Sequence, residues 1–245
     1  MDISVQFILC NLSCFKNLDI IIMTEHHLSS TFRPVEIVES GWSIQQVAGV
    51  QKRQSRQHEY RGGVAIFTRD AAELHVEQTR VIDGSSASPH QSVSWKISSD
   101  NLAHPFHITG MYMSPSEEMV EEFFHTLAKQ NNLPPNEPHI YAGDNNSHAG
   151  EEIEAHLFSQ EISKLPERIG DEKHSPVPPQ MPFLDSDRLS SKQRDRVFLK
   201  MLETTHHIIL NSSFEPKNSP TPYTWQQNKK AFIIDYYTIS KEHFK

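Results

Sequence analysis

Short apolar runs separated by polar stretches recur along most of the chain. The run over residues 20–23 reads Ile-Ile-Ile-Met, and a continuous β-branched run of this kind is typical of a strand that is buried on both faces. Similar runs predict further strands at residues 64–67, 93–97, 107–112, 139–143, 208–210 and 232–239. The chain is therefore expected to be rich in strands.

Helical spacing of apolar residues occurs in three segments, at positions 5, 8, 9 and 12, at 120, 123, 124 and 127, and at 197, 198, 201 and 202. The second segment also has start signals, because Ser114 can cap the helix, Pro115 suits the first helical position and Glu117 follows three residues after the cap. Strands joined through loops, with helices beside them, predict an α+β fold, a two-sheet β-sandwich flanked by helices.

The domain organisation follows from length and local composition. A chain of 245 residues suits a single domain over residues 1–245. Residues 151–191 are polar and acidic, contain five prolines and keep no sustained periodicity. Such a segment predicts an irregular, partly disordered insertion within the domain.

The N-terminal region bears on the compartment of the protein. The segment from Val5 to Met23 is apolar, but no basic residue precedes it and several polar residues interrupt it. We therefore expect no signal peptide and no transmembrane segment. Cys10 and Cys14 are the only cysteines, too few for a disulfide framework, and they fit a reducing compartment.

The net charge limits the binding of nucleic acid. The formal charge is −8, and since Lys and Arg supply most non-specific affinity for phosphates, a surface that grips nucleic acid throughout is excluded. A local basic patch remains compatible with this charge. Residues 51–61 contain Lys52, Arg53 and Arg61, with Glu59 as the only acid. The alternative is an ordinary solvated loop.

Chemically capable side chains stand at the ends of the expected strands. Glu25, Tyr112 and Asp235 occupy three such places, and Asp144 and Asn146 follow a fourth strand. An acid and an amide two residues apart project the same way if the chain stays extended, so they can polarise a water and hold the oxygen that it attacks. The alternatives are an ordinary Asp-x-Asn turn and a solvated acid at Glu25.

These strand ends belong to a longer pattern of motifs. The anchors are residues 22–25 (Ile-Met-Thr-Glu), 61–66 (Arg-Gly-Gly-Val-Ala-Ile), Tyr112 with Pro115, 143–146 (Gly-Asp-Asn-Asn) and 234–236 (Ile-Asp-Tyr). In this order they resemble the endonuclease/exonuclease/phosphatase superfamily. More narrowly, they resemble the apurinic-type endonuclease domain of non-LTR (LINE-type) retrotransposons, from about Leu18 to Ser240. The stretch over residues 61–67 favours the retrotransposon enzymes.

The resemblance implies a role for each strand-end residue. Glu25 matches a metal-ligand glutamate, so the implied cofactor is Mg²⁺, with Mn²⁺ as an alternative. Asp144 matches the residue that orients the attacking water or takes its proton, and Asn146 the amide that holds a phosphate oxygen. Tyr112 matches a phenol near the scissile phosphate, and Asp235 a carboxylate that orients a catalytic histidine.

The resemblance also implies DNA as the partner. His148 matches a histidine that follows the asparagine in retrotransposon enzymes, and it is expected to bind substrate together with Arg61, Lys52 and Arg53. The implied function is a magnesium-dependent endonuclease, a phosphodiesterase that nicks DNA as in retrotransposon target-site cleavage. Such an enzyme is nuclear or cytoplasmic, and no membrane partner is expected. The sequence leaves the oligomeric state open.

Two elements of the resembled family have no counterpart here: a first strand with a metal-binding asparagine, and a last strand followed by Ser-Asp-His. The chain is therefore expected to be truncated at both ends. His243 is a poor replacement, because at ~3.3 Å per residue an extended strand carries it roughly 26 Å from Asp235. Two alternatives stay open: a catalytically impaired retroelement remnant that acts at most as a binding module, and a phosphatase or lipid phosphodiesterase of the same fold.

Overall fold

The structure is a computed structural model of the chain. It describes residues 17–28, 41–51, 60–85, 88–115, 119–130, 133–134, 136–146, 193–209, 225–227, 230–232, 235–240 and 243. The helix expected over residues 5–12 and the insertion expected at residues 151–191 lie outside the described residues.

The smaller of the two main sheets has three strands in the order β1-β5-β2. Both pairs in it, β1 (Ile20–Thr24) with β5 (Val64–Arg69) and β5 with β2 (Trp42–Val47), are antiparallel. The strands expected at residues 20–23 and 64–67 are thus confirmed. The sequence does not predict β2, because the adjacent Gln45 and Gln46 break its alternation of apolar and polar positions.

The larger sheet has six strands in the order β10-β13-β9-β8-β7-β6. The bounds are β6 His75–Ile82, β7 Gln91–Ser98, β8 Phe106–Tyr112, β9 His139–Asp144, β10 His207–Ile209 and β13 Asp235–Ser240. β8 and β9 are parallel, whereas the other neighbouring pairs are antiparallel. The carboxyl ends of β8 and β9 therefore lie at the same edge of this sheet.

The last expected strand, over residues 232–239, was wrong in its extent. Phe232 ends β12 (Lys230–Phe232), which pairs with β11 (Trp225–Gln227), and a separate strand, β13, begins at Asp235. The remaining short elements in the described part of the chain are the pair β3 (Val50–Gln51) and β4 (Tyr60–Arg61) and the 3-10 helix η2 (Asp70–Ala72). The β6 strand is also absent from the sequence prediction, since its exposed edge carries mostly polar residues.

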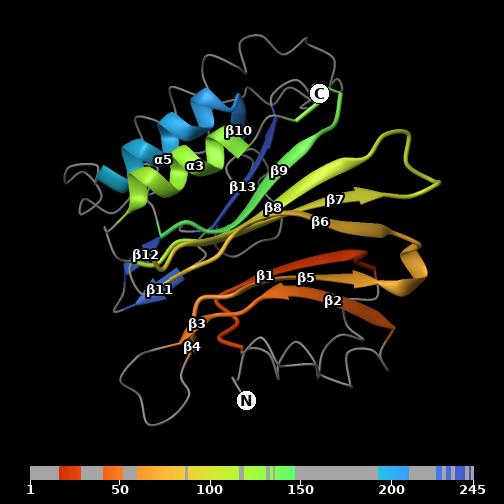
Figure 1. Cartoon of the computed structure of the whole chain (residues 1–245), viewed down its shortest axis with the longest axis horizontal. Coiled ribbons are helices and arrows are strands. Elements are labelled where there is room, and N and C mark those ends of the chain that lie inside the picture. The colour runs from red at the N-terminus through yellow and green to blue at the C-terminus, as the bar shows by residue number, and fades with distance from the viewer. Residues whose placement is uncertain are drawn as a thin grey trace, which may run out of the picture.

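Two helices, α3 (Val120–Gln130) and α5 (Gln193–Thr204), cover the face of the six-stranded sheet that is turned away from the three-stranded sheet (Figure 1). The helices bury an apolar layer against this face, with Phe123, Phe124, Leu127, Phe198 and Leu202 packed on Met111 and Tyr141. Neither helix, nor any other within the described part of the chain, is long and apolar enough to cross a membrane.

Helix α3 starts later than the capping signal at Ser114 predicts. Met119 has a φ of 59°, a left-handed conformation that cannot belong to the interior of an α-helix. The helix therefore begins at Val120, and the amide of Phe123 donates to the carbonyl of Met119. Ser114 and Pro115 lie before this break, and Glu117 of the expected capping signal lies outside the described residues.

The second apolar layer lies between the two sheets. Val64 and Ile66 of β5 pack there with a cluster from the larger sheet: Val93, Trp95, Ile97, Ile108 and Tyr112. Since side chains alternate along a strand, Ile108 and Tyr112 of β8 point toward the three-stranded sheet while Met111 points toward the helices. The two-sheet sandwich with outer helices is confirmed, and it directs Tyr112 toward the end of β1.

Candidate active site

The segment after β1 is held against the start of β5 by the backbone. The amide of Glu25 donates to the carbonyl of Gly63 at 2.8 Å, and the amide of His27 donates to the carbonyl of Gly62 at 2.9 Å. Glu25 and His27 have φ values of 56° and 58°. A non-glycine residue in this left-handed region costs on the order of 1–3 kcal/mol, and such strain concentrates at active sites and ligand clamps.

Gly62 and Gly63 allow other side chains to approach this segment closely. Their φ values are 73° and 99°. A Cβ atom on Gly62 would lie 2.7 Å from the ring of Tyr112, and one on Gly63 would lie 2.4 Å from the ring of His26. These contacts show that the backbone approaches both rings closely at the two glycines.

Two buried side chains fix the loop from inside. His26 donates from Nε2 to the carbonyl of Val47 at 3.0 Å and accepts at Nδ1 from the amide of Leu28 at 3.0 Å. Burial lowers the pKa of His26 to about 4, so the ring is neutral at pH 7. Gln91, fully buried, accepts the amide of Gly63 at 2.7 Å. Both residues support the site without facing substrate.

Tyr112, at the end of β8, reaches the carboxylate of Glu25. Its hydroxyl donates to Oε1 of Glu25 at 3.3 Å, and its side chain is 3% exposed. Burial, followed by the negative charges of Glu25 and Asp144, raises the pKa of Tyr112 well above its usual range, and the positive charge of Arg61 partly opposes this. The phenol therefore keeps its proton at neutral pH and can donate a hydrogen bond to developing negative charge.

Asp144, at the end of β9, stands beside Tyr112 in the parallel register. The chain turns after it, since Asn146 has a φ of 43°, so the condition that the chain stays extended is not met and the alternative Asp-x-Asn turn forms. Asn146 instead donates to both oxygens of Asp144, from its backbone amide at 2.8 Å and from Nδ2 at 3.0 Å. The other Nδ2 hydrogen reaches the carbonyl of Met113 at 2.6 Å. Asn146 thus orients Asp144 directly.

The buried Arg194 of α5 supports the same turn, because its Nη1 donates to the carbonyl of Asn146 at 2.9 Å. The sequence analysis did not predict this contact or the contacts of His26 and Gln91. Arg194 carries no local signal, because it lies in an amphipathic helix about fifty residues away in the sequence. Only the packing of α5 against α3 brings it to the strand ends.

The remaining expected site residues divide into two groups. Asp235 lies opposite Asp144 in the β9-β13 register, so its backbone is at the same edge of the sheet. Lys52, Arg53 and His148 lie outside the described residues. Their expected contacts with substrate stay predictions.

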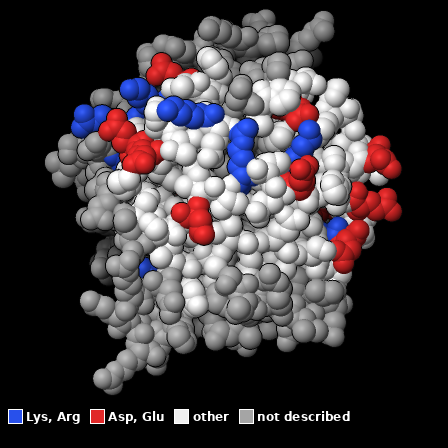
Figure 2. Space-filling view, viewed as in Figure 1, with Lys and Arg blue, Asp and Glu red and all other residues white. Residues whose placement is uncertain are grey.

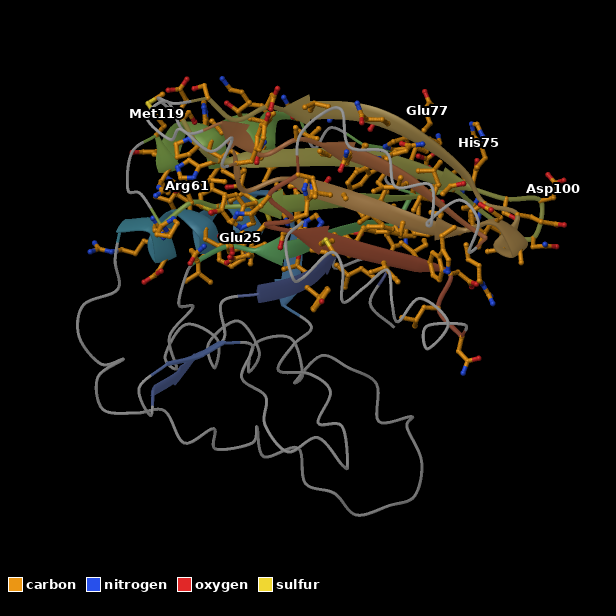
Figure 3. All side chains as sticks on the ribbon, turned by 90° about the horizontal axis from the view of Figure 1, so that it is seen from below. Glu25, Arg61, His75, Glu77, Asp100 and Met119 are labelled. Carbon is orange, nitrogen blue, oxygen red and sulfur yellow. The ribbon has the colours of Figure 1, made fainter. Side chains whose placement is uncertain are left out.

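The charges around the site are mixed in sign. Figure 3 shows Glu25 and Arg61 at the same end of the sandwich, and His75, Glu77 and Asp100 toward the opposite end. On the face seen in Figure 2, basic and acidic side chains of the described residues are interspersed. Attraction of a polyanion would therefore depend on local cations such as Arg61 rather than on a uniformly basic surface.

The oxygen groups fit a hard divalent cation. Mg²⁺ commonly takes one or two carboxylates and keeps several waters. The side chain of Glu25 is 48% exposed and can accept such an ion. Among the described residues no group of three or more His, Cys, Asp or Glu side chains could enclose a metal. The site fits an ion that takes most of its ligands from water and substrate.

No protein-family model matches the sequence, and no curated protein does. The fold, however, resembles solved structures. The human Nocturnin catalytic domain, with bound sulfate, aligns with a TM-score of 0.54 and 15% identity, covering 96% of this chain and 75% of that one. ANGEL2, a 2',3'-cyclic phosphatase in complex with adenosine-2',3'-vanadate, aligns with a TM-score of 0.53 and 13% identity, covering 98% and 75%.

A third neighbour carries the name of the class. It is an endonuclease/exonuclease/phosphatase family protein from Bacteroides thetaiotaomicron, with a TM-score of 0.50, 12% identity and coverage of 96% of this chain and 73% of that one. The present chain therefore has the endonuclease/exonuclease/phosphatase fold, as the motifs predicted. At these identities the likeness concerns the fold alone, and a specific relation to retrotransposon enzymes stays a prediction.

Proposed function

We propose that this chain is a divalent-metal-dependent phosphodiesterase that nicks DNA. The observation that carries the proposal is the convergence of Glu25, Tyr112 and Asp144 at the ends of three strands from two facing sheets. This arrangement combines a carboxylate open to solvent, a phenol that retains its proton and a buried, hydrogen-bonded acid. Hydrolysis of a phosphodiester needs a cation site, a donor and a group that handles the attacking water.

The residues have distinct tasks in this proposal. Glu25 would hold a divalent ion, which when bound neutralises charge on the phosphate and the leaving oxygen. Tyr112 donates to an oxygen of the substrate once its hydroxyl leaves Glu25. Asp144, held by Asn146, orients a water and accepts its proton. Arg61, which is exposed at the same end, attracts the anionic backbone.

DNA as the substrate, and retrotransposon target-site cleavage as the context, rest on the motif resemblance around residues 61–67. A phosphatase is the second candidate, supported by the fold likeness to ANGEL2, a 2',3'-cyclic phosphatase. The two candidates share the reaction centre and differ in what lies around it, because fold alone does not fix substrate.

A substrate panel tests the proposal. The chain is offered supercoiled plasmid, a 2',3'-cyclic nucleotide and a phosphomonoester, each with Mg²⁺ or with EDTA. We expect metal-dependent conversion of plasmid to nicked circle, lost in Glu25→Gln and retained in the control Glu77→Gln, whose carboxylate is exposed on β6. Turnover of the cyclic nucleotide or the monoester without nicking would reject the DNA substrate. A folded protein with no hydrolysis of any substrate would support the binding-module alternative.

A further inference from the structure

His27 stands beside Glu25 in the orientation of a metal ligand. Its Nδ1 lies 2.9 Å from the carbonyl oxygen of Tyr60, and because a carbonyl can only accept, Nδ1 carries the hydrogen. The lone pair of Nε2 is then available, and Nε2 lies 3.6 Å from Oε1 of Glu25. A metal-binding histidine almost always donates its other ring N–H to a carbonyl, a carboxylate or water.

The separation of the two atoms suits one shared ion. Bonds of roughly 2.0–2.2 Å to nitrogen and oxygen place two neighbouring ligand atoms about 3.0–3.5 Å apart. The observed 3.6 Å requires a shift of only a few tenths of an ångström in side chains that are 33% and 48% exposed. Glu25 is also hydrogen-bonded by Tyr112, as ligating carboxylates usually are by a neighbouring group.

The backbone holds the two side chains in this relation. Glu25 and His27 share the left-handed conformation and are each bonded to one carbonyl of the Gly62-Gly63 pair. His26 between them is buried and bonded on both ring nitrogens. The two flanking side chains are therefore presented by a fixed segment rather than by a free loop.

We propose that Glu25 and His27 together hold the divalent ion, and that the imidazole makes the site favour a first-row transition ion such as Mn²⁺ over Mg²⁺. The inference rests on the proposed function for the metal role of Glu25. Imidazole nitrogen suits first-row transition ions such as Zn²⁺ and Fe²⁺ best; Mn²⁺ is the weakest of this series, but it accepts nitrogen more readily than Mg²⁺, which strongly prefers oxygen. The pair leaves the remaining positions to water and substrate oxygens.

Direct metal binding tests the proposal without relying on activity. Mn²⁺ is titrated into the full chain and the free ion is measured by electron paramagnetic resonance, while Mg²⁺ binding is measured by competition. We expect one Mn²⁺ bound at least about tenfold more tightly than Mg²⁺, with nitrogen modulation in the spin echo of the bound ion. In His27→Asn, which tolerates the left-handed backbone, the nitrogen signal disappears and Mn²⁺ affinity falls about tenfold with little change for Mg²⁺.

The control is His75→Asn, since His75 is exposed on β6 at the opposite end. It should leave affinity and the nitrogen signal unchanged. A chain that binds no Mn²⁺, binds it without nitrogen coupling, or binds it equally well as His27→Asn overturns the inference, even if Glu25→Gln abolishes binding and so upholds the metal role of Glu25. Binding that survives Glu25→Gln contradicts both.

Discussion

The carboxyl ends and the amino ends of the parallel strands β8 and β9 both carry buried polar side chains, but these side chains are arranged differently at the two edges of the sheet. The carboxyl ends carry Tyr112 and Asp144 beside Glu25. The amino ends carry His107 and His139, which are both buried. Of the six non-glycine residues with positive φ within the described ranges, Glu25, His27 and Asn146 lie at the carboxyl ends.

The amino ends satisfy their charges internally. Glu137 accepts from Nε2 of His107 and from Nζ of Lys96 at 3.0 Å, and the hydrogen bond from His107 lowers the pKa of Glu137. His139 contacts the hydroxyl of Thr109 at 2.8 Å, and burial holds its pKa well below the usual value. Glu137 is thus paired with donors from two neighbouring strands, whereas His139 is held in its neutral form.

The difference shows that buried titratable groups alone do not mark a site. The carboxyl ends combine backbone strain, two close glycine approaches and a half-exposed carboxylate. The amino ends instead hold Glu137 between Lys96 and His107, beside buried ring nitrogens of His107 and His139 that have no hydrogen-bond partner among the described residues. Variants at the two ends should therefore separate activity from stability.

The largest expected effect is on folding at the carboxyl ends. In Gly63→Ala, a methyl group would collide with the His26 ring at a φ of 99°, so we expect a loss of about 3–4 kcal/mol in unfolding free energy. Urea denaturation measures it. Gly41→Ala is the control, since its φ is 79° and no atom lies within 4 Å of the new Cβ; it should cost only about 1 kcal/mol. Equal losses would contradict the close approach.

Acid should destabilise both ends, because each has a histidine that is buried in the neutral form. Burial lowers the pKa of His26 and of His207 from 6.5 to about 4. Between these values the unfolded chain binds a proton that the folded protein does not, so stability is full above pH 6.5 and falls toward pH 4, by roughly 3 kcal/mol per histidine.

Urea unfolding at pH 7 and pH 5 tests this slope. Because burial also holds the pKa of His139 well below its usual value, His207→Gln should flatten the slope by only about a third, and His75→Gln, at an exposed position, should leave it unchanged. A stability that does not change between the two pH values would show that these rings are not held neutral.

Tyr112→Phe should affect activity more than folding. It removes the donor next to Glu25, and loss of one such donor to developing charge costs about 10²-fold in rate. Plasmid nicking in Mg²⁺ measures the effect, with Tyr237→Phe, 52% exposed on β13, as the control. Nicking at the wild-type rate would remove Tyr112 from the reaction centre.

The smallest effect is expected from Lys96→Met at the amino ends. The variant breaks the ion pair with Glu137, whose side chain is 11% exposed, and we expect a loss of about 1 kcal/mol in unfolding free energy. At a temperature where both proteins are fully folded, the variant should nick plasmid at the wild-type rate. A large drop in rate would mean that the amino ends also serve catalysis.

The sequence predicted those parts of the fold and site that depend on local pattern. The β-branched run of β1, the apolar run of β5 and the glycine pair between β4 and β5 each have a short-range cause, and all are confirmed. The strand-end positions of Glu25 and Tyr112 follow from the same pattern. Their mutual contact does not, because 87 residues separate them and only the facing of the two sheets brings them together.

Other features depend on packing that no local pattern encodes. The turn at Asn146 is local in part, since both of its amide groups donate to Asp144 two residues before it, but its bond to the carbonyl of Met113 depends on packing. His26 and Gln91 become internal supports only because the Gly62-Gly63 backbone lies against them. The late start of α3 likewise follows from the left-handed Met119, not from a sequence cap.

The most direct test of the strand-end site is nicking of supercoiled plasmid by the purified chain, in Mg²⁺ and in EDTA, with Asp144→Asn and the exposed control Asp100→Asn. The account predicts nicking that stops in EDTA, falls about 10²- to 10⁴-fold in Asp144→Asn and persists in Asp100→Asn. Folded Asp144→Asn that nicks at the wild-type rate would contradict the central role of this cluster.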